Sequence, residues 1–271
     1  MIRPFLQFIK RSPIGNLLRQ RHLFCVGLPK AGTESVARLF ERNFRSVHEP
    51  RYVESIELAC AFEAGQLSTR EVTEALIRRD REMRLDMEAS HVMARFAPAL
   101  ADTFKDARFI LTVRDPISWL DSELNQCINY PNSNTASGFA PWIRLRNVCY
   151  GPIPADRPSE ELSLESYQLH SLDGLLGYWQ RHISGVLKGV PRDRLLVLRV
   201  EDLSNSLEQI ASFADVPVSS LAAERSHSHK AAVRHRVLDG IPADYLRSKV
   251  AEHCSALCDV YYPDSEPART K

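Results

Sequence analysis

The sequence has almost no net charge and no apolar run long enough to cross a membrane. Its 271 residues hold 35 Lys and Arg against 34 Asp and Glu, which gives a formal net charge of +1. This balance excludes a polybasic nucleic-acid binder and an acidic disordered chain. We therefore expect a globular protein with no membrane-spanning segment and no nucleic acid among its partners.

Glycine, proline and cysteine are also sparse. The 11 Gly and 16 Pro exclude a collagen-like or low-complexity chain. The six Cys are scattered and form no Cys-x-x-Cys pair, whereas disulfide frameworks belong to short secreted chains. We expect reduced thiols and a cytoplasmic location. Residues 1–20 lack the features of a signal peptide and predict a helical extension.

Short apolar runs alternate with helical stretches along the chain, as expected for parallel strands joined by helices. This rhythm predicts a single α/β domain over 1–271, a three-layer sandwich around a central, mainly parallel sheet of about five strands. The expected strands are 22–26, 44–47, 84–88, 108–113 and 194–199. The expected helices are 33–43, 53–64, 69–81, 92–104, 116–127, 164–187, 203–213 and 244–261.

The segment 128–165 interrupts this rhythm. It is rich in Pro, Gly, Asn and Ser and also contains Tyr130, Trp142 and Tyr150. A long loop in a compact domain is commonly a lid or binding loop, and the aromatic residues favour a packed lid over disorder. We expect this segment to cover the acceptor side of a site.

The sequence G-L-P-K-A-G-T-E-S, residues 27–35, follows the first strand and opens the next helix. Backbone N–H groups and a helix N-terminus meet at such a loop and predict an anion site, to which Lys30 adds charge. In the NTPase loop the Lys follows the last Gly, but here Thr33 follows Gly32, so the loop is only P-loop-like. The alternative is that Gly and Pro merely shape a turn.

A second candidate, R-D-P-I-S-W-L-D-S, begins with Arg114 at the end of the 108–113 strand. Ligands of open α/β sheets bind at the carboxyl ends of strands, and an Arg fork suits a phosphate. Ser122 lies about two helical turns further on and could contact the same phosphate. The alternative is that Arg114 and Asp115 only cap a helix.

Together the two motifs, in this order, resemble the sulfotransferases that use 3′-phosphoadenosine 5′-phosphosulfate (PAPS), of the bacterial small-molecule or carbohydrate type. The segment L-L-V-L-R-V-E-D-L, residues 195–203, is similar to a strand–helix junction of that family. The resemblance implies a P-loop NTPase-like fold, PAPS as donor, adenosine 3′,5′-bisphosphate as product, and no metal. It implies a loop for the 5′-phosphosulfate and an Arg–Ser pair for the 3′-phosphate. The corresponding donor-binding residues are Pro29, Lys30, Ala31, Gly32, Thr33, Glu34, Ser35, Arg114, Ser122 and Lys230.

Two of these positions depart from the family pattern. Glu34 stands where the family has a hydroxyl residue, so either Glu34 points outward or Ser35 supplies the hydroxyl. The C-terminal phosphate loop of cytosolic members is absent, and Lys230 is a substitute whose alternative is a solvated basic loop.

Sulfuryl transfer needs a cation at the leaving oxygen, for which Lys30 is the candidate, and a general base for the acceptor. Three residues compete as the base: His91, Glu49 and His48. A histidine suits the task without tuning, which slightly favours His91. Glu49 would need a pKa raised by burial.

The expected partner is a small-molecule or carbohydrate acceptor, such as secondary metabolism offers, sulfated at a hydroxyl or amine; a homodimer is left open. One alternative is a P-loop metabolite kinase that uses ATP and Mg²⁺. The other is a non-catalytic binding protein that has kept the sulfotransferase fold.

Overall fold

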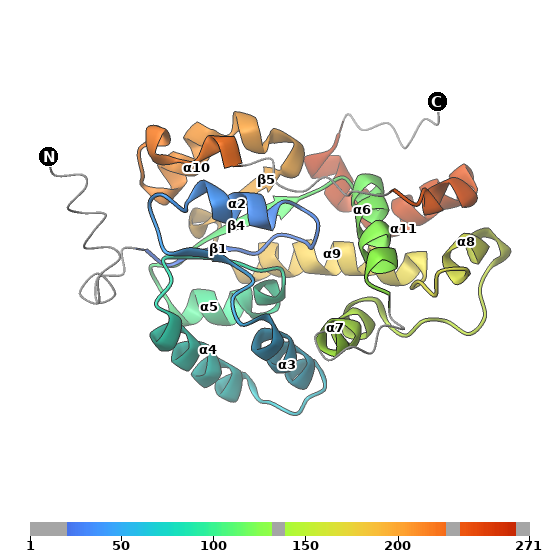
Figure 1. Cartoon of the computed structure of the whole chain (residues 1–271), viewed down its shortest axis with the longest axis horizontal. Coiled ribbons are helices and arrows are strands. Elements are labelled where there is room, and N and C mark those ends of the chain that lie inside the picture. The colour runs from blue at the N-terminus through green and yellow to red at the C-terminus, as the bar shows by residue number, and fades with distance from the viewer. Residues whose placement is uncertain (1–20, 132–138, 226–233, 264–271) are drawn as a thin grey trace, which may run out of the picture.

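The computed structural model describes residues 21–131, 139–225 and 234–263. Its five strands form one sheet in the order β2-β3-β1-β4-β5, and each neighbouring pair is parallel (Figure 1). The strands are β1 (Leu23–Cys25), β2 (Ser46–His48), β3 (Met87–Ala89), β4 (Arg108–Val113) and β5 (Leu195–Arg199). This confirms the predicted α/β fold with a five-stranded parallel sheet.

Helices connect the strands and cover both faces of the sheet. The α-helices are α2 (Thr33–Leu39), α3 (Tyr52–Glu63), α4 (Thr69–Met83), α5 (Ala97–Thr103), α6 (Pro116–Asn129), α7 (Ala140–Tyr150), α8 (Leu162–Glu165), α9 (Leu172–Gly189), α10 (Leu207–Ala214) and α11 (Ala243–Tyr261). The longer 3₁₀ segments are η2 (Val92–Phe96) and η5 (Val200–Asn205).

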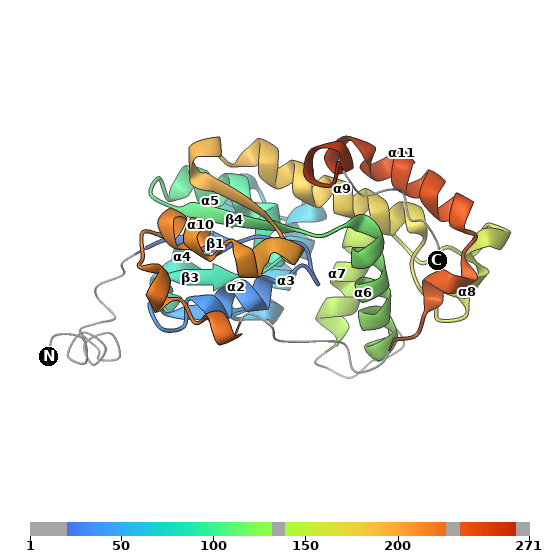
Figure 2. The ribbon, with the colours of Figure 1, turned by 90° about the horizontal axis from the view of Figure 1, so that it is seen from above.

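Two hydrophobic cores lie on opposite faces of the sheet. Leu23 and Cys25 pack in one core, while Phe24 and Val26 pack in the other, because side chains alternate along a strand. Helices α2 and α10 close the first core, and α3, α4, α5 and α9 are among the helices that close the second (Figures 1 and 2). Burying each large apolar side chain stabilises the fold by roughly 1.5–3 kcal/mol. The three predicted layers follow from these two cores.

All five strands run in the same direction, so their carboxyl ends meet at one edge of the sheet. The residues at or just beyond these ends are Val26, Glu49, Ser90, Arg114 and Val200. The strand order places β1 between β3 and β4. The loop after β1 therefore lies between the strand that leads to His91 and the strand that leads to Arg114.

The segment 128–165 contains more helix than its composition suggests. Helices α7 and α8 lie within it, and Pro141 stands in the first turn of α7, where proline is compatible with a helix. The predicted helix 164–187 is divided into α8 and α9, and Ser171 caps α9 by accepting a hydrogen bond from the N–H of Gly174. The predicted helix 92–104 divides at Pro98, before which a 3₁₀ turn forms. The predicted extension 1–20 and Lys230 lie outside the described residues.

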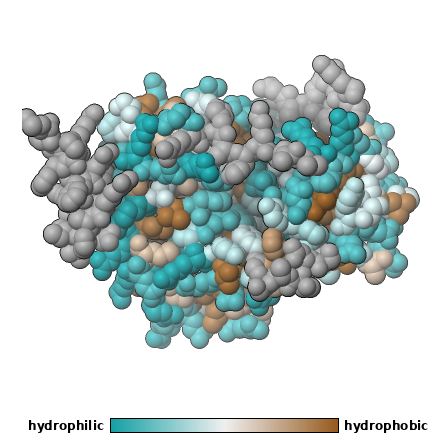
Figure 3. Space-filling model, viewed as in Figure 1, coloured by the Kyte–Doolittle hydropathy of each residue, from teal (hydrophilic) through white to brown (hydrophobic). Residues whose placement is uncertain are grey.

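No helix within the described ranges is both long enough and apolar enough to span a bilayer. On the face shown in Figure 3, the described residues form several separate hydrophobic areas between hydrophilic ones. Single apolar areas of this kind are ordinary on the surface of a globular protein.

Candidate active site

The loop between β1 and α2 is held in a tight, partly left-handed path. Lys30 has φ 59° and Gly32 has φ 80°, a region in which a non-Gly residue is strained. A Cβ on Gly27 would come within 1.8 Å of the Thr112 hydroxyl oxygen, so only glycine lets β4 approach this closely. The two predicted loop glycines are thus required by geometry, and Lys30 is held at the carboxyl edge of the sheet.

Two fully buried tryptophans fix the backbone on either side of this loop. The indole N–H of Trp119 donates to the carbonyl of Pro29 at 2.9 Å, and that of Trp179 donates to the carbonyl of Arg114 at 2.9 Å. Since both indoles are buried, each bond replaces one that water would otherwise make. Trp119 and Trp179 therefore anchor both halves of the predicted donor site.

Arg114 lies against the lysine loop. Its Nη1 donates to the carbonyl oxygen of Lys30 at 3.0 Å, and its Nε donates to the Ser118 hydroxyl at 3.0 Å. Burial lowers the pKa of Arg114, while the nearby carboxylates of Glu201, Asp121 and Asp115 act in the opposite direction. The guanidinium keeps its charge in any protein environment, so a second cationic residue lies against the backbone of the loop that carries Lys30.

Helix α6 turns one face toward the loop. Trp119 contacts Pro29, and Gln126 accepts a hydrogen bond from Lys30 Nζ at 3.4 Å. Ser122 lies three residues after Trp119 and four before Gln126, so it shares their face of the helix. The side chain of Arg114 bonds to Ser118 rather than to Ser122 in this structure.

The first turn of α2 shows where the Glu34 side chain lies. Its carboxylate pairs with Arg38 at 2.5 Å, one turn along the helix, so its charge is neutralised next to the predicted anion site. Thr33 is buried, and its hydroxyl lies 3.1 Å from Nε2 of His48. Because α2 has only seven residues, the positive charge here comes chiefly from Lys30 and Arg114 rather than from the helix.

Two of the three candidate bases form a pair. Nδ1 of His91, after β3, lies 2.8 Å from Oε1 of Glu49, after β2. Burial raises the pKa of the Glu49 carboxyl, but the hydrogen bond from His91 and the charges of His91, His48 and Lys30 together bring it below its ordinary value of 4.5. Glu49 is thus ionised at neutral pH. An ionised carboxylate only accepts hydrogen bonds, so Nδ1 of His91 donates.

An aromatic stack holds the ring of His91. Trp142 of α7 lies on it, with ring centres 5.6 Å apart, and Tyr52 of α3 lies on Trp142 at 5.4 Å. Because His91 and Tyr52 both stack on the indole ring of Trp142, little of that ring is left for contact with an acceptor. Tyr150, a further aromatic of the predicted lid, is buried and donates to Glu123. Two aromatic residues of the predicted lid, Trp142 and Tyr150, therefore pack against the protein, and Trp142 does so on the candidate base, whereas Tyr130 is 43% exposed.

A neutral, buried histidine forms a hydrogen bond to the backbone at the end of β1, where the loop begins. Nε2 of His182 lies 2.9 Å from the carbonyl oxygen of Val26, and its Nδ1 lies 3.0 Å from the Tyr178 hydroxyl. Burial lowers the pKa of His182 to about 3, more than its bond to Val26 raises it. The carbonyl can only accept, so Nε2 carries the proton and Nδ1 accepts from Tyr178.

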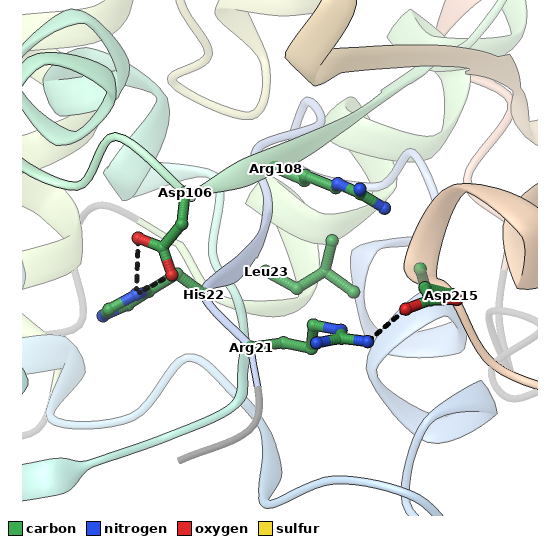
Figure 4. A pocket seen from close by; sticks show the side chains of 7 residues that line it. Arg21, His22, Leu23, Asp106, Arg108 and Asp215 are labelled. Carbon is green, nitrogen blue, oxygen red and sulfur yellow. Dashed lines mark hydrogen bonds and ion pairs between the residues drawn. The ribbon is translucent and has the colours of Figure 1, made fainter.

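A cleft of about 190 Å³ opens at the other, amino-terminal edge of the sheet. Arg21 pairs with Asp215 there, and His22 lies 3.2 Å from Asp106 (Figure 4). Leu23 and Arg108, which begin β1 and β4, also line it. Ligands of open parallel sheets bind beyond the opposite ends of the strands, so we place the active site at the carboxyl edge.

The structure gathers most of the predicted site residues at that edge. They are the loop 29–35, Arg114 and Ser122 on one side, and His48, Glu49 and His91 on the other. Sequence reasoning missed Gln126, Tyr52 and His182. Gln126 had a usable signal, since it continues the helix face of Trp119 and Ser122. Nothing local in the sequence pointed to Tyr52 or His182.

Residues 22–232 of the sequence match the family described as a sulfotransferase domain. The match covers most of the chain, and the protein therefore belongs to the sulfotransferase family. This confirms the resemblance on which the interpretation of the loop and of Arg114 rested. No protein with a curated function matches the sequence.

Two solved sulfotransferases are similar to this chain, and one of them shares its fold. A sulfotransferase from Alicyclobacillus acidocaldarius superposes with a TM-score of 0.51 at 13% identity, covering 92% of this chain and 98% of the other. A sulfotransferase from Mycobacterium avium gives a TM-score of 0.45 at 13% identity, covering 96% of this chain and 82% of the other. At such identity the first likeness establishes the fold.

Proposed function

We propose that this sulfotransferase moves the sulfuryl group of PAPS to a hydroxyl or amine of a small-molecule or carbohydrate acceptor. One observation carries the proposal: the cationic loop of Lys30, the guanidinium of Arg114 and the His91–Glu49 pair lie at the same edge of one sheet. Cations at one point and a base nearby are what in-line transfer from a phosphate leaving group requires.

The residues at the loop fit a doubly phosphorylated nucleotide. Lys30 and Arg114 supply positive charge, Thr33 and Ser122 supply hydroxyls, and the carboxylate of Glu34 is neutralised by Arg38. We assign Lys30 and Thr33, with the backbone of 29–35, to the 5′-phosphosulfate. Arg114 and Ser122 are assigned to the 3′-phosphate. Because cationic side chains carry the charge, the scheme uses no metal.

His91 is the proposed base. With Nδ1 donating to Glu49, the lone pair of the neutral imidazole is at Nε2, which has no hydrogen-bond partner among the described residues. The acceptor oxygen or nitrogen attacks sulfur, its proton passes to Nε2, and the bond from sulfur to the bridging phosphate oxygen breaks. Lys30 stabilises the charge that appears on that oxygen, and Glu49 stabilises the imidazolium. General-base catalysis of this kind contributes about 10²–10⁴-fold to a rate.

We assign a different role to His48. Its Nε2 faces the Thr33 hydroxyl rather than open space, so we assign it to orienting that hydroxyl at the donor loop. The geometry of the loop does not support the alternative of a P-loop kinase. Lys30 precedes the final glycine of the loop and has a left-handed backbone conformation, whereas the lysine of an NTPase loop follows that glycine.

Calorimetry with nucleotides tests the donor assignment. Adenosine 3′,5′-bisphosphate should bind the purified protein at least tenfold more tightly than ATP with Mg²⁺. Binding of ATP–Mg²⁺ without binding of the bisphosphate would instead support the kinase.

A transfer assay with labelled sulfate and a panel of acceptors tests catalysis. Lys30→Ala should lower turnover by about 10²–10³-fold, the usual effect of removing a group that stabilises developing charge. Lys105→Ala is the matched control, because the Lys105 side chain is exposed and its ammonium pairs with Asp102 at 3.5 Å. Binding of the bisphosphate with no transfer to any acceptor would favour the non-catalytic alternative.

A further inference from the structure

A buried arginine contacts strand β3, which leads to His91, and the turn after β2 that contains Glu49. Arg79 of α4 is only 5% exposed, as is Glu88 of β3. Nη1 of Arg79 lies 2.5 Å from Oε2 of Glu88, and its Nη2 donates to the carbonyl oxygen of Pro50 at 2.8 Å. One guanidinium thus holds both β3, three residues before His91, and the residue that follows Glu49.

The turn that Arg79 contacts has a strained backbone. Glu49 has φ 47° and Arg51 has φ 50°, with Pro50 between them. Two left-handed non-Gly residues so close together persist only where the surroundings hold them. The N–H of Glu49 is held by the carbonyl of Ala89 in β3 at 2.8 Å, and the Pro50 carbonyl is held by Arg79. The backbone of Glu49 is therefore held on both sides.

Packing alone does not require a charged pair at this place. Burying an arginine and a glutamate costs desolvation that an apolar pair of similar size would avoid. An apolar pair, however, has no donor for the Pro50 carbonyl. What Arg79 supplies beyond volume is a fixed, forked donor that reaches a carboxylate and a carbonyl together.

We infer that Arg79 is a positioning residue for the catalytic pair: it sets the Glu49–Pro50–Arg51 turn so that the Glu49 carboxylate meets Nδ1 of His91. This inference rests on the proposed role of that pair. Arg79 contacts Glu88 and the Pro50 carbonyl and acts through the position of Glu49, so it is not itself a catalytic residue. A merely structural arginine would link α4 to the sheet with no effect on the state of the His91 ring.

Arg79→Lys tests the inference. A lysine keeps the charge opposite Glu88 but cannot reach the carboxylate and the Pro50 carbonyl with the same fork. The two ring nitrogens of His91 are followed by ¹⁵N NMR in the full chain without ligand. We expect the share of the tautomer protonated at Nδ1 to fall as Glu49 loses its fixed position, because the hydrogen bond to Glu49 selects that tautomer. We also expect kcat to fall about tenfold, with the affinity for adenosine 3′,5′-bisphosphate within twofold of wild type.

The controls separate this inference from the function on which it rests. Arg70→Lys, on the exposed face of the same helix, should change neither the tautomer share of His91 nor kcat. If Arg79→Lys does not fold, the double variant Arg79→Met/Glu88→Met fills the space with apolar side chains and should show the same loss of the Nδ1-protonated tautomer.

A folded Arg79 variant with an unchanged share of the Nδ1-protonated His91 tautomer would overturn the inference, provided that Glu49→Ala lowers that share. If Glu49→Ala also leaves the share unchanged, the proposed catalytic pair is wrong and the inference is overturned with it. Loss of bisphosphate binding in the wild type would instead count against the donor assignment alone, since the NMR readout needs no nucleotide.

Discussion

Nδ1 of His91 and Oε1 of Glu49 lie 2.8 Å apart, although 42 positions separate the two residues in the chain. The strand order makes the contact, because β2 and β3 are parallel neighbours and both residues follow the ends of these strands. Sequence reasoning treated His91 and Glu49 as competitors for one role. The structure instead places them in one hydrogen bond, and on that contact we propose the histidine as the base and the carboxylate as the group that orients it.

Arg114 should distinguish the two phosphates of the donor product. Arg114→Met removes the guanidinium assigned to the 3′-phosphate, so adenosine 3′,5′-bisphosphate should lose about 10–100-fold in affinity. Adenosine 5′-phosphate should lose less, and that part reflects the bond from Arg114 to the Lys30 carbonyl. Calorimetry with both nucleotides measures the ratio. An equal loss for the two would show that Arg114 acts only through the loop.

The hydroxyl of Thr33 should matter more than its methyl group. Thr33→Val keeps the shape of the side chain but removes the hydroxyl that faces His48, and we expect about a tenfold weaker affinity for the bisphosphate. Thr33→Ser retains the hydroxyl and should bind within about threefold of wild type. The dissociation constants of both variants test the assignment, which fails if the serine variant is as weak as the valine variant.

Glu49 should stabilise the fold in a pH-dependent way. Burial and the opposing hydrogen bond and charges of His91 leave the pKa of Glu49 below 4.5. A carboxyl with a lowered pKa in the folded state contributes stability that is present above pH 4.5 and is lost as the pH falls through its folded pKa. The unfolding free energy of wild type should therefore exceed that of Glu49→Gln near pH 6 and approach it near pH 3.

Urea unfolding of the two proteins at several pH values measures this difference. His91 must be considered at the same time, so Glu49→Gln is compared with Glu49→Gln/His91→Gln. A difference between wild type and Glu49→Gln that does not change from pH 6 to pH 3 would contradict the assigned ionisation.

His182 should contribute to loss of stability in acid. Burial lowers its pKa from 6.5 to about 3, so the unfolded chain takes up a proton that the folded chain refuses. Stability should fall as the pH drops from 6.5 towards 3, by up to about 1.4 kcal/mol per pH unit from this one group. His182→Gln should remove this contribution, which corresponds to about one proton taken up on unfolding. Denaturant unfolding between pH 7 and pH 4 measures it.

His170 provides a comparison for the same experiment, since burial and the charges of Arg146 and Arg157 lower its pKa to about 4. His170→Gln should reduce the slope over a narrower range, from pH 6.5 to about 4. A slope unchanged by His182→Gln would mean that this histidine is protonated in the folded protein.

The parallel sheet, the lysine loop and the arginine at the end of β4 could all be predicted from the sequence. These features are local: alternating apolar runs predict strands, and Gly27, Lys30 and Gly32 stand at a strand–helix junction whose chemistry follows from their spacing. The family resemblance rested on the same local motifs. The ends of helices and strands were predicted less well. Helix α7 was missed because Pro141, which stands in its first turn, looks like a loop residue in the sequence.

Which of these residues contact one another could be seen only in the folded structure. The pairing of His91 with Glu49, the stack of Trp142 on His91 and the bond from Arg79 to the Pro50 carbonyl all join residues distant in sequence. Each depends on strand order and on which helix covers which face. Local periodicity does not encode either property, because both follow from the free energy of packing the whole chain.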